Sequence, residues 1–176
     1  MGTILKYKHY PLKTVLLANL VSLGIYGSGF IVMLKAGIYF AFGYLLFILY
    51  LEYRMVKFHC SGCFYRGKRC GFGKGFISAC FFKKGNQATF SMKKATWKDL
   101  IPDMLISLIP LITGIILLIL VFDILLIMTM LFLIFVTTSG NGYIRSSLTC
   151  NHCKQREMGC PADKLFHPEK QDHSLL

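Results

Sequence analysis

Apolar residues gather in four long blocks along the chain, and basic, cysteine-bearing segments separate them. The blocks cover residues 14–34, 38–51 with an extension to 56, 102–122 and 124–138. A hydrocarbon layer about 30 Å thick is crossed by about 20 apolar residues in a helix. The pattern therefore predicts four transmembrane helices, of which the fourth is short unless it continues through Ser139 and Gly140.

The apolar run over residues 100–138 is too long for one span. As a single helix it would reach roughly 58 Å, about twice the thickness of the hydrocarbon layer. Asp123 is the one plausible place for the chain to turn back, and residues 35–37 make the turn between the first two spans. We also expect a kink at Pro110, and an interfacial helix that places Trp97 at headgroup depth.

The positions of the basic residues predict the orientation. The chain has 20 Lys and Arg against 8 Asp and Glu, and 55% of its residues are hydrophobic. Nineteen of the basic residues fall on one side of the predicted spans, and Lys35 falls on the other. The positive-inside rule then places both termini, the central loop and all 7 cysteines in the cytoplasm. Lys and Arg segregated in this way set membrane topology, so lipids are expected partners and nucleic acid is not.

Two cysteine segments share one frame. CSGCFYRGKRCGFGKGF begins at Cys60, and CNHCKQREMGCPADKLF begins at Cys150. We call residues 60–76 the first arm and residues 150–166 the second arm. Both follow the pattern Y-x6-C-x2-C-x6-C-x3-K-x-F at a constant offset of 90 residues. The repeated frame predicts a duplicated unit of two spans followed by one arm, and two such repeats have parallel topology about an axis along the membrane normal.

The predicted fold is an all-α membrane protein with four transmembrane helices, arranged as two tandem hairpins in a parallel pseudo-two-fold repeat. A small Cys-rich cytoplasmic metal-binding loop follows each hairpin. The predicted units are a basic lead with the first hairpin, a Cys-rich loop, the second hairpin and a Cys-rich tail, over residues 1–56, 57–99, 100–142 and 143–176.

Thiols at these spacings suit a tetrahedral metal–thiolate site. The cytosol keeps thiols reduced, which favours metal ligation over disulfides. Zinc and an iron–sulfur cluster both accept such ligands. The spacing of the two arms is similar to that of the binuclear zinc cluster of fungal transcription factors, and this similarity covers the cysteines alone. The predicted ligands are Cys60, Cys63, Cys70, Cys150, Cys153 and Cys160, with Cys80 and His152 as candidate additional ligands.

Three arrangements of the ligands remain open. All six thiols could share two ions, or the four thiols of the two Cys-x2-Cys pairs could surround one ion or cluster. In the third arrangement the arms stay separate, and each recruits a fourth ligand: Cys80 in the first, and His152 or His167 in the second.

The predicted function is that of a membrane scaffold, sensor or redox subunit, with a cytoplasmic protein and a second copy of the chain as candidate partners. One alternative is a soft-metal transporter or delivery protein, for which Asn19, Ser22, Thr113 and Asp103 are the candidate intramembrane polar groups. The other is a membrane thiol–disulfide oxidoreductase. The sequence contains no nucleophile elbow, H-E-x-x-H motif or phosphate loop, so enzymatic activity is not favoured.

Overall fold

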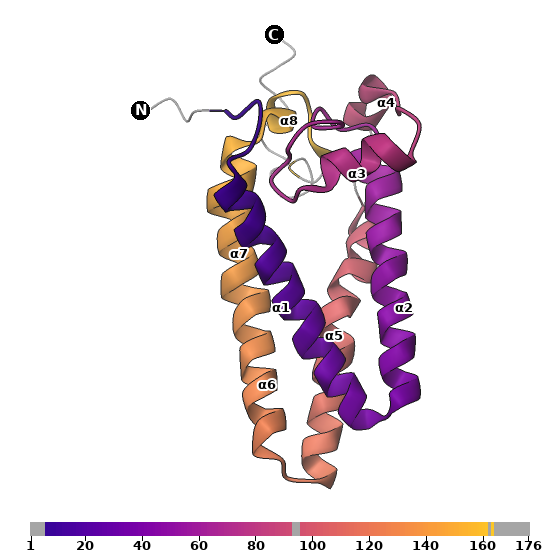
Figure 1. The fold of residues 1–176 in the computed structure, drawn as a ribbon, viewed down its shortest axis with the longest axis vertical. Coiled ribbons are helices and arrows are strands. Elements are labelled where there is room, and N and C mark those ends of the chain that lie inside the picture. The colour runs from indigo at the N-terminus through magenta and orange to yellow at the C-terminus, as the bar shows by residue number, and fades with distance from the viewer. Residues whose placement is uncertain (1–5, 93–95, 162, 164–176) are drawn as a thin grey trace.

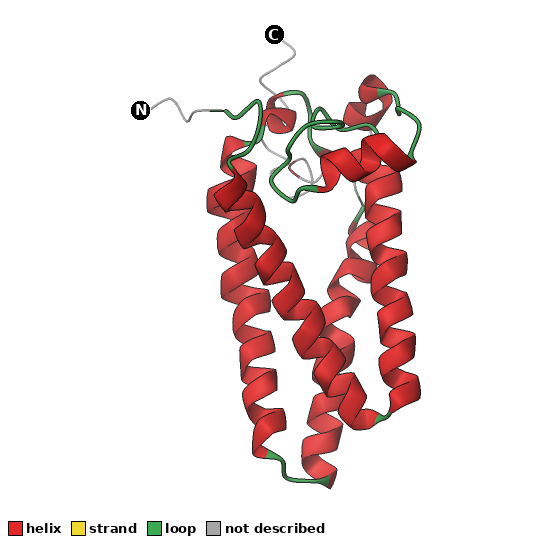
Figure 2. Cartoon of the chain, viewed as in Figure 1, coloured by secondary structure: helices red, strands yellow, loops and turns green. Residues whose placement is uncertain are grey.

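The computed structural model describes residues 6–92, 96–161 and 163, and this part of the chain consists of helices joined by loops and turns, without strands (Figure 2). Four long helices form a bundle, and shorter helices lie together at one end of it (Figure 1). The bundle consists of α1 (Leu12–Ala36), α2 (Ile38–Met55), α5 (Trp97–Leu120) and α6 (Ile124–Phe135). The short helices at this end are α3 (Lys74–Phe81), α4 (Gln87–Met92) and α8 (Lys154–Glu157), while α7 (Asn141–Tyr143) lies within the long helix that continues from α6.

The four long helices have the length and composition of membrane spans. With their helical continuations they cover Leu12–Ala36, Ile38–Cys60, Asp99–Leu120 and Ile124–His152. Large apolar side chains such as Leu20, Phe42 and Ile119 are exposed on their outer surfaces. Apolar faces of this extent are unfavourable in water and are solvated well by lipid. The prediction of a four-helix membrane protein is therefore confirmed at this level.

Helix α1 is the centre of the bundle, because it packs against α2, α5 and α6. Close approach to α2 occurs at Gly29, where a methyl group would overlap the hydroxyl of Tyr44. Tyr44 is buried, and its hydroxyl donates a hydrogen bond of 2.6 Å to the carbonyl of Ile106 on α5. Three helices thus meet at one tyrosine, whose polar end is satisfied by a backbone carbonyl within an apolar core.

The two hairpins turn at the same end of the bundle, which we call the turn end (Figure 1). Gly37 makes the first turn with φ of 143°, a value that favours glycine. Asp123 makes the second turn and caps α6 by accepting a hydrogen bond of 2.9 Å from the amide of Leu125. Lys35 and Asp123 form an ion pair of 2.6 Å that joins the two turns. The turn predicted at Asp123 is confirmed.

The fourth span is longer than its apolar block. The helix continues from α6 through two π-helical turns, Val136–Gly140 and Ile144–Thr149, and ends in the 3-10 turn Cys150–His152. The Thr149 hydroxyl donates to the carbonyls of Ile144 and Arg145 at 3.0 and 3.1 Å, which suits the wider turn. The chain therefore stays helical past Gly140 and carries Cys150 at the helix end.

The third span begins earlier than its apolar block. The amide of Thr96 donates to the Asp99 carboxylate at 3.0 Å, which stabilises the first turn of α5. Helix α5 is continuous through Pro102 and Pro110. The short helix expected before it is α4, and Trp97 is the first residue of α5 itself.

The contact at Gly29 generates a stability prediction. Replacing Gly29 with Ala should lower the free energy of unfolding by about 1–3 kcal/mol, because the added methyl group displaces the Tyr44 ring from a packed core. Thermal unfolding of the detergent-purified protein measures this. Gly27→Ala is the matched control on the same helix, since a methyl group there would meet no atom within 4 Å. Equal melting temperatures for the two variants would contradict the packing described.

Candidate functional site

Both arms lie at the end of the bundle opposite the turns, which we call the loop end (Figure 1). All seven cysteines are at this end and remain free thiols. Each arm is entered from a π-helical turn: Val56–Cys60 precedes the first and Ile144–Thr149 the second. Single π-helical turns are frequent at functional sites, because they redirect the side chains that follow them.

The two Cys-x2-Cys turns have the same backbone hydrogen bonds. The amide of Cys63 donates to the carbonyl of Cys60 at 3.4 Å, and the amide of Cys153 donates to that of Cys150 at 3.2 Å. The next turn is also shared, since the backbone amides of Arg66 and Arg156 donate to the carbonyls of Cys63 and Cys153 at 3.1 and 3.3 Å. Each pair of bonds is related by the offset of 90 residues found in the sequence.

The second thiol of each pair also receives a backbone amide. The amide of Tyr65 donates to the Cys63 sulfur, and the amides of Gln155 and Arg156 donate to the Cys153 sulfur. Such bonds favour the thiolate form, because an N–H dipole stabilises a negative sulfur. A turn that directs amides at a sulfur is a suitable frame for a thiolate ligand.

Burial has the larger effect on these two thiols. It raises the pKa of Cys63 to about 12 and raises the pKa of Cys153 as well, against the opposing effect of the backbone amides. Neighbouring thiols raise both pKa values further: Cys153 raises the pKa of Cys63, and Cys160 raises the pKa of Cys153. The interaction between Cys63 and Cys153 joins the two arms, so sulfur atoms from both halves of the chain lie within electrostatic range of each other.

Two reciprocal hydrogen bonds hold the arms against each other. The amide of Phe64 donates to the side-chain oxygen of Gln155 at 2.7 Å. The amide of Lys154 donates to the hydroxyl oxygen of Tyr65 at 3.0 Å. Positions 64 and 154 correspond in the repeated frame, and so do positions 65 and 155. In each arm, therefore, the backbone amide of the residue directly after the second cysteine is the donor. Its acceptor is the side chain two positions after the second cysteine of the other arm.

The segment before α1 closes over this contact. Tyr7 donates its amide to the carbonyl of His152 at 3.1 Å and accepts the Tyr65 hydroxyl at its own carbonyl at 2.6 Å. The Tyr7 ring also stacks on the imidazole of His152, with centroids 4.9 Å apart. His152 thus packs against the lead in addition to its position beside Cys153.

Tyr10 makes a second bridge between the arms. Its amide donates to the carbonyl of Arg69 at 3.0 Å, and its hydroxyl donates to the carbonyl of Thr149 at 2.6 Å. Tyr10 is 2% exposed, so both bonds are shielded from water. This role of the lead was not predicted from the sequence, because residues 1–13 were treated as a basic flank of the first span. The available signal was the presence of two tyrosines, Tyr7 and Tyr10, among its lysines.

The remaining candidate ligands differ in their surroundings. Cys80 is exposed on α3, and Cys150 is exposed at the end of the fourth span. Cys60, Cys70 and Cys160 are half-buried. His167, together with Lys164 and Phe166 of the repeated frame, lies outside the described residues. Among the described residues, no three His, Cys, Asp or Glu side chains gather closely enough to hold a metal ion. The ligand assignment remains a prediction.

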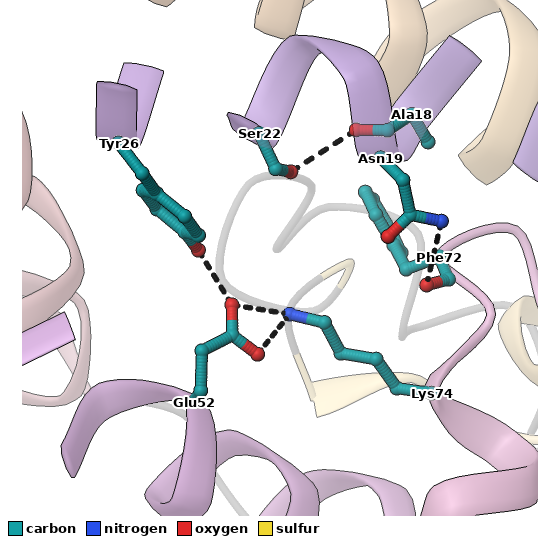
Figure 3. A network of polar contacts seen from close by, with 7 residues as sticks. All are labelled: Ala18, Asn19, Ser22, Tyr26, Glu52, Phe72 and Lys74. Atoms are coloured by element: carbon teal, nitrogen blue, oxygen red, sulfur yellow. Dashed lines mark hydrogen bonds and ion pairs between the residues drawn. The ribbon is translucent and has the colours of Figure 1, made fainter. Parts of the chain in front are cut away.

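A second polar cluster lies below the first arm (Figure 3). Glu52 on α2 forms an ion pair of 2.6 Å with Lys74, the first residue of α3, and accepts the Tyr26 hydroxyl from α1 at 2.5 Å. In the sequence, Glu52 directly follows the second apolar block and Lys74 belongs to the repeated frame, and no motif joins them. The sequence held one signal for this cluster, because Glu52 is the only acidic residue within residues 38–60.

The chain matches no protein-family model, and neither the curated proteins nor the solved structures contain a match to it. The geometry of the two clusters therefore carries the functional argument.

The reciprocal contact generates a prediction about local opening. Replacing Tyr65 with Phe removes the acceptor of the Lys154 amide, and a lost bond of about 1–3 kcal/mol should speed exchange of that amide about five- to a hundred-fold. Hydrogen–deuterium exchange with mass spectrometry measures this. Tyr53→Phe is the control, because the exposed Tyr53 hydroxyl contacts only the nearby Lys57 side chain among the hydrogen bonds of the described residues. Unchanged exchange at Lys154 would show that the arms are held by other contacts.

Proposed function

We propose that this chain is an integral membrane protein in which two duplicated arms form one metal–thiolate module. The module would hold zinc or an iron–sulfur cluster. The observation that supports the proposal most is the reciprocal pair of hydrogen bonds between the arms, which relates Phe64 to Gln155 and Lys154 to Tyr65. At equivalent positions, a backbone amide of each arm is satisfied by a side chain of the other arm. Such reciprocal contacts are expected where two copies of one unit pack against each other.

The proposed ligands are Cys60, Cys63 and Cys70 from the first arm and Cys150, Cys153 and Cys160 from the second. Cys63 and Cys153 would be central to the module, since they interact across the arms and each receives backbone amides at its sulfur. When bound, a metal would supply the positive charge that converts these buried thiols to thiolates. Cys80 is exposed on α3 and is not among the proposed ligands.

The module would face the cytoplasm. The 19 basic residues on the side of the cysteines support this orientation, and the reducing environment there would keep the thiols available to metal. A role as scaffold, sensor or redox subunit follows from the position of the module: it ties together the ends of the second and fourth spans, so loading with metal would fix how the two hairpins meet. A cytoplasmic protein that recognises the basic loop end is the proposed partner.

Metal analysis tests the module. Wild type, Cys63→Ser and Cys80→Ser are purified anaerobically as full chains, and bound zinc and iron are measured by elemental analysis together with visible absorption. Cys63→Ser should lose about half or more of the metal, because a multi-thiolate site loses a ligand and its local fold. Cys80→Ser should keep it.

The outcomes of this experiment separate the readings. A brown protein absorbing near about 400 nm indicates iron–sulfur, and a colourless protein holding zinc indicates a zinc site. Wild type without either metal, or equal loss in the two variants, would remove the proposal.

Thiol labelling tests the orientation. A membrane-impermeant maleimide should leave the exposed Cys80 unlabelled in intact cells and should label it after permeabilisation. In the Lys35→Cys variant the new thiol lies at the turn end and should react in intact cells; loss of the exposed Lys35–Asp123 ion pair should cost little, about 1 kcal/mol or less. Labelling of Cys80 before permeabilisation would reverse the assigned orientation.

A further inference from the structure

An open pocket of about 490 Å³ lies between α1, α2 and the start of α3. Its polar residues are Asn19, Ser22, Tyr26, Glu52 and Lys74. Figure 3 shows the Tyr26 hydroxyl and the Lys74 ammonium meeting at the Glu52 carboxylate, while Ser22 donates to the carbonyl of Ala18. Pockets of about 300–1,000 Å³ with a few convergent polar groups are typical of small-molecule sites. Phe72, Gly73 and Lys74 of the first arm form part of its wall, but no cysteine lines it, and the proposed metal–thiolate module does not use it.

The pocket lies beside the part of a candidate membrane span that leads to the loop end. Glu52 is eight residues before Cys60, the end of the second span, which places it about 12 Å along the helix from that end. An ionisable residue inside a span is costly unless it is paired, and such residues are functional-site candidates by default. Two apolar side chains at the pocket, Leu23 and Ile77, are 65% and 49% exposed on the outer surface. The pocket therefore opens toward the region that acyl chains occupy.

The loop before α3 is held in place over the pocket. Asn19 donates its amide to the carbonyl of Val15 at 2.8 Å and lies 3.5 Å from the carbonyl of Phe72. Gly73 adopts φ of 74°, and a methyl group there would press on Val15. The close approach and the left-handed backbone both favour glycine at this position, and they bring Lys74 to the carboxylate of Glu52.

Counting donors and acceptors shows what the ion pair can still bind. A carboxylate has about four acceptor sites, and the Tyr26 hydroxyl and the two contacts of Lys74 use three of those on Glu52. An ammonium has three donors, and Lys74 uses two of them on Glu52. Among the contacts of the described residues, one acceptor site on Glu52 and one donor on Lys74 remain unused.

We infer that this pocket binds the headgroup of an amine-bearing phospholipid, of the phosphatidylethanolamine type. A zwitterion laid against the Glu52–Lys74 pair forms a ring of alternating charges, with its ammonium on Glu52 and its phosphate on Lys74. The Asn19 side-chain oxygen and the Ser22 hydroxyl are further acceptors for the ammonium N–H groups. The acyl chains then leave past Leu23 and Ile77.

This chemistry discriminates among headgroups. The trimethylammonium of phosphatidylcholine has no N–H to donate to Glu52, Asn19 or Ser22. Phosphatidylglycerol has no cation, so its phosphate would lie beside Glu52 without compensation. Charge-assisted hydrogen bonds are about twice as strong as neutral ones, so an ethanolamine headgroup is preferred over both.

Native mass spectrometry of the full chain in detergent tests the inference, with dioleoyl phosphatidylethanolamine, phosphatidylcholine and phosphatidylglycerol supplied at equal concentration. The ethanolamine adduct should exceed each of the others about tenfold. Glu52→Gln should reduce this preference to about twofold or less, since it removes the charge that selects the ammonium. The readout does not require metal, so it can fail or succeed independently of the thiolate module.

Asp123→Asn is the matched control, because it removes a carboxylate paired with a lysine at 2.6 Å at the opposite end of the bundle. It should keep the preference. Asn19→Leu is a second pocket variant in case Glu52→Gln does not fold, since Asn19 is exposed and its change should also reduce the preference.

Soluble glycerophosphoethanolamine, which lacks acyl chains, distinguishes a lipid site from a site for the free headgroup. It should bind much more weakly than the lipid. Equal binding of the three lipids by wild type, an unchanged preference in the folded pocket variants, or equal binding of the soluble headgroup would each overturn the inference.

Discussion

Two backbone amides, one from each arm, donate to side chains of the other arm and hold the loop end together. The Phe64 amide is satisfied by Gln155, and the Lys154 amide is satisfied by Tyr65. A half-buried amide without an acceptor costs about 1–3 kcal/mol, so each turn depends on the other for its own stability. The two turns that carry Cys63 and Cys153 lie against each other as a result, and Cys153 raises the pKa of Cys63. Separate turns would have no reason to bring their sulfur atoms into one region, and the proposed module would have no frame.

The membrane part of the protein supplies the ends that this contact joins. Helix α1 packs against the three other long helices, so its lead is placed over both arms and its middle over the Glu52–Lys74 pair. At the turn end, Lys35 and Asp123 tie the two hairpins together a second time. The hairpins are thus joined at both ends, by an exposed ion pair at one and by buried hydrogen bonds at the other. The buried bonds carry more of the stability, because exposed ion pairs are screened by solvent.

Much of the fold could be predicted from the sequence, because the transfer of side chains into lipid depends on local composition. Hydropathy predicted the four spans, and a single aspartate in an apolar run predicted the second turn. The continuation past Gly140 could not be predicted with the same certainty, since Thr, Ser and Gly resemble a span end while the backbone stays helical. The spacing of the cysteines predicted which thiols to consider together. The partners of Tyr7, Tyr10 and Glu52 are far from them in the sequence, so these contacts could be described only from the structure.

The hydroxyl of Tyr10 reaches the carbonyl of Thr149, which is 139 residues later in the chain. During synthesis the lead leaves the ribosome first, and its acceptor is made only after every span. The hairpins can enter the bilayer one after the other. The lead can reach Tyr65 and Arg69 once the first arm is made, whereas its contacts with His152 and Thr149 require the last helix. Contacts between such distant residues form slowly, because the intervening chain must be ordered first. The contacts of the lead with the end of the fourth span are therefore completed last, after the second hairpin has been inserted.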